Sequence, residues 1–154
     1  MGRLDTSLEA AGAEFLVLGT LLTNGILSFK AYSNFPGYDI VATNPEANVT
    51  CLIQVKSRWA TDYNRTFLMR NFDCDFVVLV ALNRGYRSLS KRAIKDGSQK
   101  PPQYYVFPVQ VAQDARDPSS GWGRISLRLI ANLGMYEDNW GQVQDFLRLN
   151  HGSL

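Results

Sequence analysis

The order of apolar and polar positions along the chain predicts a helix, several strands and a final helix. Apolar residues recur at spacings of three and four over residues 6–24, as on one helical face. Asp5 or Thr6 can cap its start, and Asn24-Gly25 supplies a stop. Glu14 lies at the margin of that face. We expect the stripe facing the core to be Leu8, Ala11, Phe15, Leu18 and Leu22.

Extended segments follow, and their patterns separate surface strands from a buried one. Residues 38–42 and 51–56 flank a turn-forming stretch and predict an antiparallel hairpin. Residues 75–82 are nearly continuously apolar, which is typical of a strand covered on both faces. Residues 26–32 alternate weakly, and residues 104–109 predict a strand near a sheet edge because their proline cannot donate to a ladder.

The C-terminal part completes an α/β pattern. Residues 125–130 predict a short strand or helix, and residues 139–149 predict a helix that buries Trp140, Val143, Phe146 and Leu147. A helix, strands and a helix in this order predict a mixed central β-sheet flanked by helices. The length of 154 residues favours a single domain over residues 1–154.

Composition excludes several classes of protein. Apolar residues make up 45% of the chain, enough for a core, but no apolar run approaches the roughly 18 residues that span a bilayer. The N-terminus lacks the pattern of a secretory signal. His151 as the single histidine and two cysteines exclude zinc fingers and argue against a histidine-based triad. We therefore expect a soluble, cytoplasmic protein without membrane association.

The net charge of +2 is unevenly spread. Residues 54–100 hold ten basic and four acidic residues, which gives +6 in this segment. Local basic surface is what phosphate backbones select, although a solvated loop has the same composition. The loop after residue 82 predicts DNA-phosphate contacts by Arg84, Arg87, Lys91, Arg92 and Lys95.

The candidate chemistry lies on the predicted hairpin. Gln54 and Lys56 share one strand face because residues two apart point the same way. If the hairpin pairs these faces, Asp39 lies beside them, and Glu14 can project over the same sheet end. Two carboxylates with further oxygen donors suit Mg²⁺. The alternative is a solvated hairpin with a surface ion pair between Asp39 and Lys56, worth under about 1 kcal/mol.

Gly37-Tyr38-Asp39 followed by Gln54-Val55-Lys56 resembles the motif of the PD-(D/E)XK nuclease superfamily, in the variant with glutamine at the acidic position. Glu14 matches the glutamate that many members carry on a preceding helix. Intron homing endonucleases and archaeal Holliday junction resolvases are the most similar members, over about residues 6–82. Two departures are Gln54 itself and Pro36, which precedes Gly37 instead of standing directly before Asp39.

The resemblance implies a restriction-endonuclease-like core and a metal-dependent DNA endonuclease that hydrolyses phosphodiester bonds with Mg²⁺ or Mn²⁺. It implies Glu14, Asp39 and the Val55 carbonyl as metal ligands, Gln54 in the acidic ligand position and Lys56 as the catalytic lysine. A homing-type, site-specific enzyme is the first interpretation. A Holliday junction resolvase, a repair nuclease or a catalytically inactive nucleic-acid-binding module with the same fold are the alternatives.

Ser57 and Arg58 follow Lys56 directly and are further candidates for contacting phosphates. Both residue types are also ordinary at a strand end. The expected partner is double-stranded DNA. We expect a homodimer or homotetramer, because one small domain brings one site while the two strands of a duplex require two.

Overall fold

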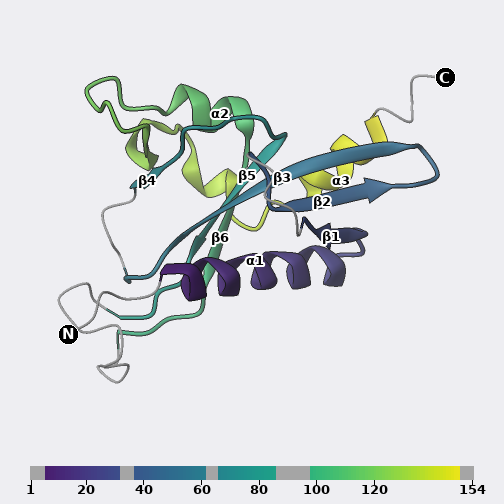
Figure 1. Cartoon of the computed structure of the whole chain (residues 1–154), viewed down its shortest axis with the longest axis horizontal. Helices are drawn as coiled ribbons and strands as arrows, with labels where there is room; N and C mark the ends of the chain where they lie inside the picture. The colour runs from purple at the N-terminus through teal and green to yellow at the C-terminus, as the bar shows by residue number, and fades with distance from the viewer. Residues whose placement is uncertain (1–5, 32–36, 62–65, 86–97, 150–154) are drawn as a thin grey trace.

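The computed structural model describes residues 6–31, 37–61, 66–85 and 98–149 (Figure 1). In this part of the chain no helix is long and apolar enough to cross a membrane. The elements are α1 (Thr6–Thr23), β1 (Ser28–Lys30), β2 (Ile40–Asn44), β3 (Val49–Arg58), β4 (Thr66–Leu68), β5 (Phe76–Ala81), β6 (Gln103–Pro108), α2 (Val109–Asp114), β7 (Arg124–Ser126), the 3₁₀ turns η1 (Leu127–Leu129) and η2 (Leu133–Tyr136), and α3 (Gly141–Leu149).

A mixed five-stranded sheet in the order β1-β2-β3-β5-β6 forms the centre of the fold. The predicted hairpin is confirmed, since β2 and β3 pair antiparallel, whereas β3 and β5 pair parallel. The strand with Pro108 lies at the sheet edge, as its proline predicts. A second sheet of β4 and β7 was not predicted, and residues 125–130 contribute to both β7 and η1. The expected α/β class is confirmed.

Two apolar layers cover the sheet. One layer packs α1 and α3 on the face that buries Ile53 and Val55 of β3. The other packs β4, β7 and α2 on the face that carries Leu52 and Leu79. Figure 1 shows α1 along one side of the sheet, with α2 and β4 on the opposite side. Even-numbered residues of β3 therefore face the second layer, away from α1.

The position of α1 is as predicted, but the stripe it buries is not. Ala13, Val17 and Leu21 are fully buried, whereas Leu8 and Phe15 are 73% and 55% exposed. Leu22 of the expected stripe is exposed too. The helix is apolar on both faces, so the spacing of apolar residues does not by itself decide which face is buried. The spacing pattern therefore indicated the wrong face, while Glu14 does border the buried one.

The parallel pairing of β3 with β5 begins at a two-point clamp. The backbone N–H of Asp75 donates to the Leu52 carbonyl at 2.8 Å, and the Leu52 N–H donates to Asp75 Oδ2 at 2.8 Å. The carboxylate thus takes the place of a backbone acceptor where the ladder starts. This holds β3, the strand with the motif residues, against the most buried strand of the sheet.

Candidate metal and nuclease site

The site lies where β3 exchanges one partner strand for another. β3 pairs with β2 up to Ile53 and with β5 from Ile53 to Arg58. Beyond Ile53, the β3 edge that faced β2 continues without that strand. Asp39 occupies this fork: its N–H donates to the Ile53 carbonyl at 2.8 Å, and its Oδ2 accepts from the Val55 N–H at 2.8 Å. The carboxylate therefore continues the ladder where the strand ends.

The hairpin register brings the predicted residues together. Ile40 pairs with Ile53 and Val41 with Leu52, so Asp39 and Gln54 are the next residues on their strands beyond the last pair. Lys56 is two residues further along the same face, and its positive charge lowers the pKa of Asp39. In a strand, a residue's N–H and C=O point to the same edge. The Val55 carbonyl therefore lies on the edge where Asp39 accepts the Val55 N–H.

Glu14 approaches this site from α1. Burial raises its pKa, and the negative charge of Asp39 raises it further. Burial is also the largest cause of the raised pKa of Asp39, against the lowering effects of the Val55 N–H and Lys56. Two partly buried carboxylates that influence one another are costly as anions. A bound cation would offset that cost.

The oxygen donors fit a hard divalent cation whose coordination shell contains both carboxylates and uncharged oxygens. In the described part of the chain, no group of three or more histidine, cysteine, aspartate or glutamate side chains is placed to hold a metal. The site offers two carboxylates, Glu14 and Asp39, and beside them the Gln54 amide and the Val55 carbonyl. Mg²⁺ binds through one or two carboxylates and keeps several waters, so this set matches its chemistry.

Lys30 lies beside the candidate site, and the sequence did not reveal its position. It pairs with Ile40, the residue after Asp39, and its positive charge lowers the pKa of both Asp39 and Glu14. Its Nζ lies 4.2 Å from the ring centroid of Phe15, a cation–π contact that holds it beside the helix. Weak alternation around β1 gave no register, so no signal in the sequence placed Lys30 near the carboxylates.

Ser57 and Arg58 diverge because successive strand residues point to opposite faces. Ser57 faces α1, where its hydroxyl donates to Glu9 Oε1 at 3.2 Å. Arg58 faces the other layer with Lys56, and its Nη2 donates to Thr66 Oγ1 at 3.4 Å. The predicted phosphate-contacting pair is therefore split, with Arg58 alone on the face of Lys56.

The predicted basic loop is described in part. Arg84 is partly buried, and its backbone N–H donates to the Trp59 carbonyl at 2.9 Å, which ties the loop start to the end of β3. The other predicted phosphate contacts lie outside the described residues: Arg87, Lys91, Arg92 and Lys95.

The fold matches solved structures, although neither a protein-family model nor a curated protein matches the sequence. The structure of a bacterial homing endonuclease, I-Ssp6803I, aligns with a TM-score of 0.59 over 96% of this chain and 95% of that chain, at 21% identity. The chain has the PD-(D/E)XK nuclease fold. The restriction-endonuclease-like core implied by the motif is thus confirmed. Hjc, a Holliday junction resolvase from Archaeoglobus fulgidus, aligns with a TM-score of 0.47 over 79% of this chain and 86% of that chain, at 17% identity.

Proposed function

We propose that this protein is a metal-dependent DNA endonuclease that hydrolyses phosphodiester bonds. The observation that carries the proposal is the gathering of Asp39, Gln54 and Lys56 on one face of the sheet at the fork of β2 and β3, with Glu14 beside them. A homing-type, site-specific enzyme is the first choice, because the match to I-Ssp6803I extends over nearly the whole of both chains.

The metal proposed is Mg²⁺ or Mn²⁺, held by Glu14, Asp39 and the Val55 carbonyl, with the Gln54 amide in the position of an acidic ligand. Such an ion supplies Lewis-acid stabilisation of the phosphate and lowers the pKa of bound water. The chain's part is to hold two carboxylates in a partly buried fork, where the Val55 N–H orients Asp39. Gln54 in place of a carboxylate leaves the site with one fewer negative charge.

Lys56 acts on the reacting phosphate from the face it shares with Gln54. Its ammonium group offsets the negative charge that grows on the phosphate oxygens in the transition state and orients the attacking water. Arg58 lies two residues further on the same face and binds the DNA backbone. Arg58, which binds the phosphate backbone, and Lys56, the catalytic group, thus come from one strand, so the geometry of the sheet fixes the distance between them.

The test is nicking of supercoiled plasmid with Mg²⁺ or Mn²⁺. Asp39→Asn removes a charge but keeps an oxygen that can accept the Val55 N–H, so it should lose at least about 100-fold in rate while it stays folded. Asp145→Asn is the matched control, because this exposed carboxylate on α3 lies outside the site. Asp39→Asn cleaving at the wild-type rate would overturn the assignment.

The alternative class is a catalytically inactive DNA-binding module, and the observation that favours it is the glutamine at position 54. Wild-type protein that binds duplex DNA but nicks nothing with either metal would establish it. Among active enzymes, cleavage of one defined duplex sequence indicates a homing role. Cleavage of four-way junctions or damaged DNA instead indicates a resolvase or repair nuclease.

We further propose that the partner is double-stranded DNA and that the protein acts as a homodimer or homotetramer. One site serves one strand, and a two-fold pair of sites matches the symmetry of a duplex. The exposed side chains Leu8, Phe15 and Leu22, seven residues apart on α1, support association between copies. Sedimentation velocity tests this, and a monomer at micromolar concentration with DNA bound would contradict it.

A further inference from the structure

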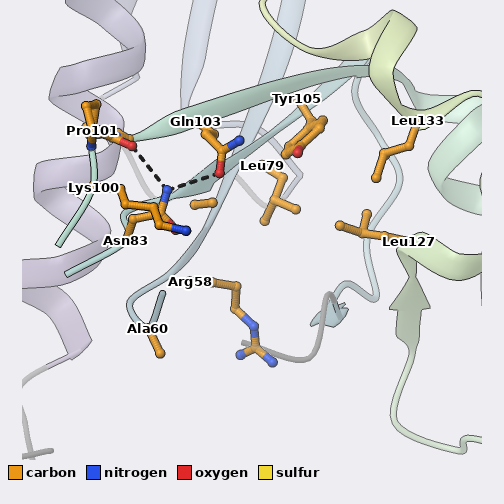
Figure 2. A pocket seen from close by; sticks show the side chains of 12 residues that line it. Arg58, Ala60, Leu79, Asn83, Lys100, Pro101, Gln103, Tyr105, Leu127 and Leu133 are labelled. Atoms are coloured by element: carbon orange, nitrogen blue, oxygen red, sulfur yellow. Dashed lines mark hydrogen bonds between the residues drawn. The ribbon is translucent and has the colours of Figure 1, made fainter. Parts of the chain in front are cut away.

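A cavity of about 460 Å³ opens at the C-terminal ends of β3 and β5, on the face of the sheet that carries Lys56 (Figure 2). Leu79, which lines it, is the pairing partner of Lys56, and Arg58 lines it too. Arg58 is one strand repeat beyond Lys56, about 6.6 to 6.8 Å along β3. The cavity is therefore the immediate neighbour of the candidate catalytic lysine.

The lining divides into a polar and an apolar half. Figure 2 shows Asn83 and Lys100 on one side and Tyr105, Leu127 and Leu133 on the other. Arg58 and Lys100 supply two positive charges, and among the described lining residues none is acidic. One half therefore suits a phosphate and the other a flat, weakly polar ring.

The polar wall is held in place before any ligand arrives. Asn83 is 3% exposed, and its Nδ2 donates to the Pro101 carbonyl and to Gln103 Oε1, both at 3.1 Å. Gln103 Nε2 donates in turn to Glu137 Oε1 at 3.0 Å. The Lys100 N–H donates to the Asn83 carbonyl at 3.0 Å, which fixes the backbone that carries the cation. Because this wall is already ordered, little conformational entropy is lost when a ligand binds against it.

We propose that this cavity receives one nucleotide of the DNA strand adjacent to the cleaved phosphate, with its base turned out of the stack. The inference rests on the proposed nuclease function. A site for phosphate alone needs no leucine and tyrosine half, whereas extruded bases are held between aromatic and apolar side chains. A cavity of about 460 Å³ lies within the usual size range of small-ligand sites and cannot admit a paired duplex.

The consequence is a substrate preference. Turning a base out of a duplex costs unstacking and unpairing energy, and the cost is smallest for a base that is already unpaired. DNA with one unpaired nucleotide should therefore bind about tenfold or more tightly than the same duplex without it. The substrate class that fits the cavity is therefore locally distorted DNA.

The experiment is fluorescence anisotropy in EDTA at one salt concentration, with a labelled duplex and the same duplex carrying one unpaired adenine. The measured quantity is the ratio of the two dissociation constants for each protein. Leu133→Trp fills the apolar half and Lys100→Ala removes a cation from the polar half. Both should bring the ratio close to one. Leu129→Trp and Arg148→Ala are the matched controls on exposed positions outside the cavity and should keep the wild-type ratio.

A wild-type ratio near one overturns the proposal, as does a ratio retained by both cavity variants. Loss of the ratio in Lys100→Ala alone supports it even if Leu133→Trp does not fold. The proposed function fails separately: a protein that neither nicks plasmid with Mg²⁺ or Mn²⁺ nor binds any duplex refutes the nuclease assignment. A protein that nicks and binds duplex with a ratio of one refutes only the cavity.

Discussion

Gly37 offers the sharpest test of how the backbone holds the site. Its φ is +101°, and it lies two residues before Asp39. A Cβ at this position would lie 2.7 Å from Asn71 Oδ1 and 3.0 Å from the Asp73 carbonyl oxygen. Gly37→Ala therefore strains the backbone and also forces a neighbouring segment to move.

The magnitude can be worked out with two other glycines as references. Gly25 has φ +77° with nothing within 4 Å of an added Cβ, so Gly25→Ala reports backbone strain alone, about 1–2 kcal/mol. In Gly37→Ala, Asn71 Oδ1 must also yield its hydrogen bond from the Asp73 N–H at 2.8 Å, which adds about 1 kcal/mol. Each kcal/mol lowers the melting temperature by about 2–4 °C at this chain length.

Thermal unfolding by circular dichroism checks this series. Gly121→Ala, with open space around the added methyl group, should keep or slightly raise the melting temperature. Gly25→Ala should lower it, and Gly37→Ala should lower it by a further 2–4 °C, roughly. Mn²⁺ titration calorimetry should show weaker binding for Gly37→Ala only. A melting temperature of Gly37→Ala at or above that of Gly25→Ala would refute the argument from the Cβ contacts.

Four further outcomes are expected. Without metal, Glu14→Gln should raise the melting temperature at pH 8, because burial and Asp39 raise the pKa of Glu14 and its ionisation then costs stability. The gain in melting temperature should vanish as the pH falls toward 4.5, and a gain at every pH would contradict the prediction. Lys30→Met should move the pH midpoint of Mn²⁺ binding upward, since the Lys30 charge lowers the pKa of both Glu14 and Asp39. Calorimetry at a series of pH values measures this midpoint, and an unchanged midpoint places Lys30 outside the site. Gln54→Glu should tighten Mn²⁺ binding by adding a charge, and unchanged affinity in calorimetry would put residue 54 outside the ligand set. Replacing three basic residues of the loop with alanine, Lys91, Arg92 and Lys95, should flatten the slope of log affinity for duplex DNA against log salt by about two to three units. Fluorescence anisotropy measures this slope, and an unchanged slope would mean that the loop is only a solvated surface.

The hairpin and the positions of the candidate residues on it could be predicted because their signals are local. Strand alternation assigned Gln54 and Lys56 to one face, and the expected pairing of the two strands agrees with the observed register, in which Ile40 pairs with Ile53. The continuous apolar run of β5 identified a strand covered on both faces for the same reason. An alternation with a period of two determines which residues share a strand face, and a short loop restricts how the two strands pair.

The parts that could not be predicted depend on contacts between distant segments. The buried face of α1 carries Ala13 and Val17, and the spacing of apolar residues does not distinguish it from the second apolar face, which is exposed. The position of Lys30 depends on the pairing of β1 with β2, and its pattern of three residues is too short to set a register. The sheet of β4 and β7 joins two three-residue strands that lie far apart in the sequence.

The hydrogen bond from the Val55 N–H to Asp39 Oδ2 links the chemistry of the site to the cooperativity of the sheet. Because the carboxylate serves as the next rung of the ladder, it cannot swing away without exposing the Val55 amide. Proton–deuterium exchange at that single amide therefore reports on the carboxylate itself. Slow exchange, matching that of the β5 amides, would mean that the site opens only when the whole molecule unfolds, with no separate local opening.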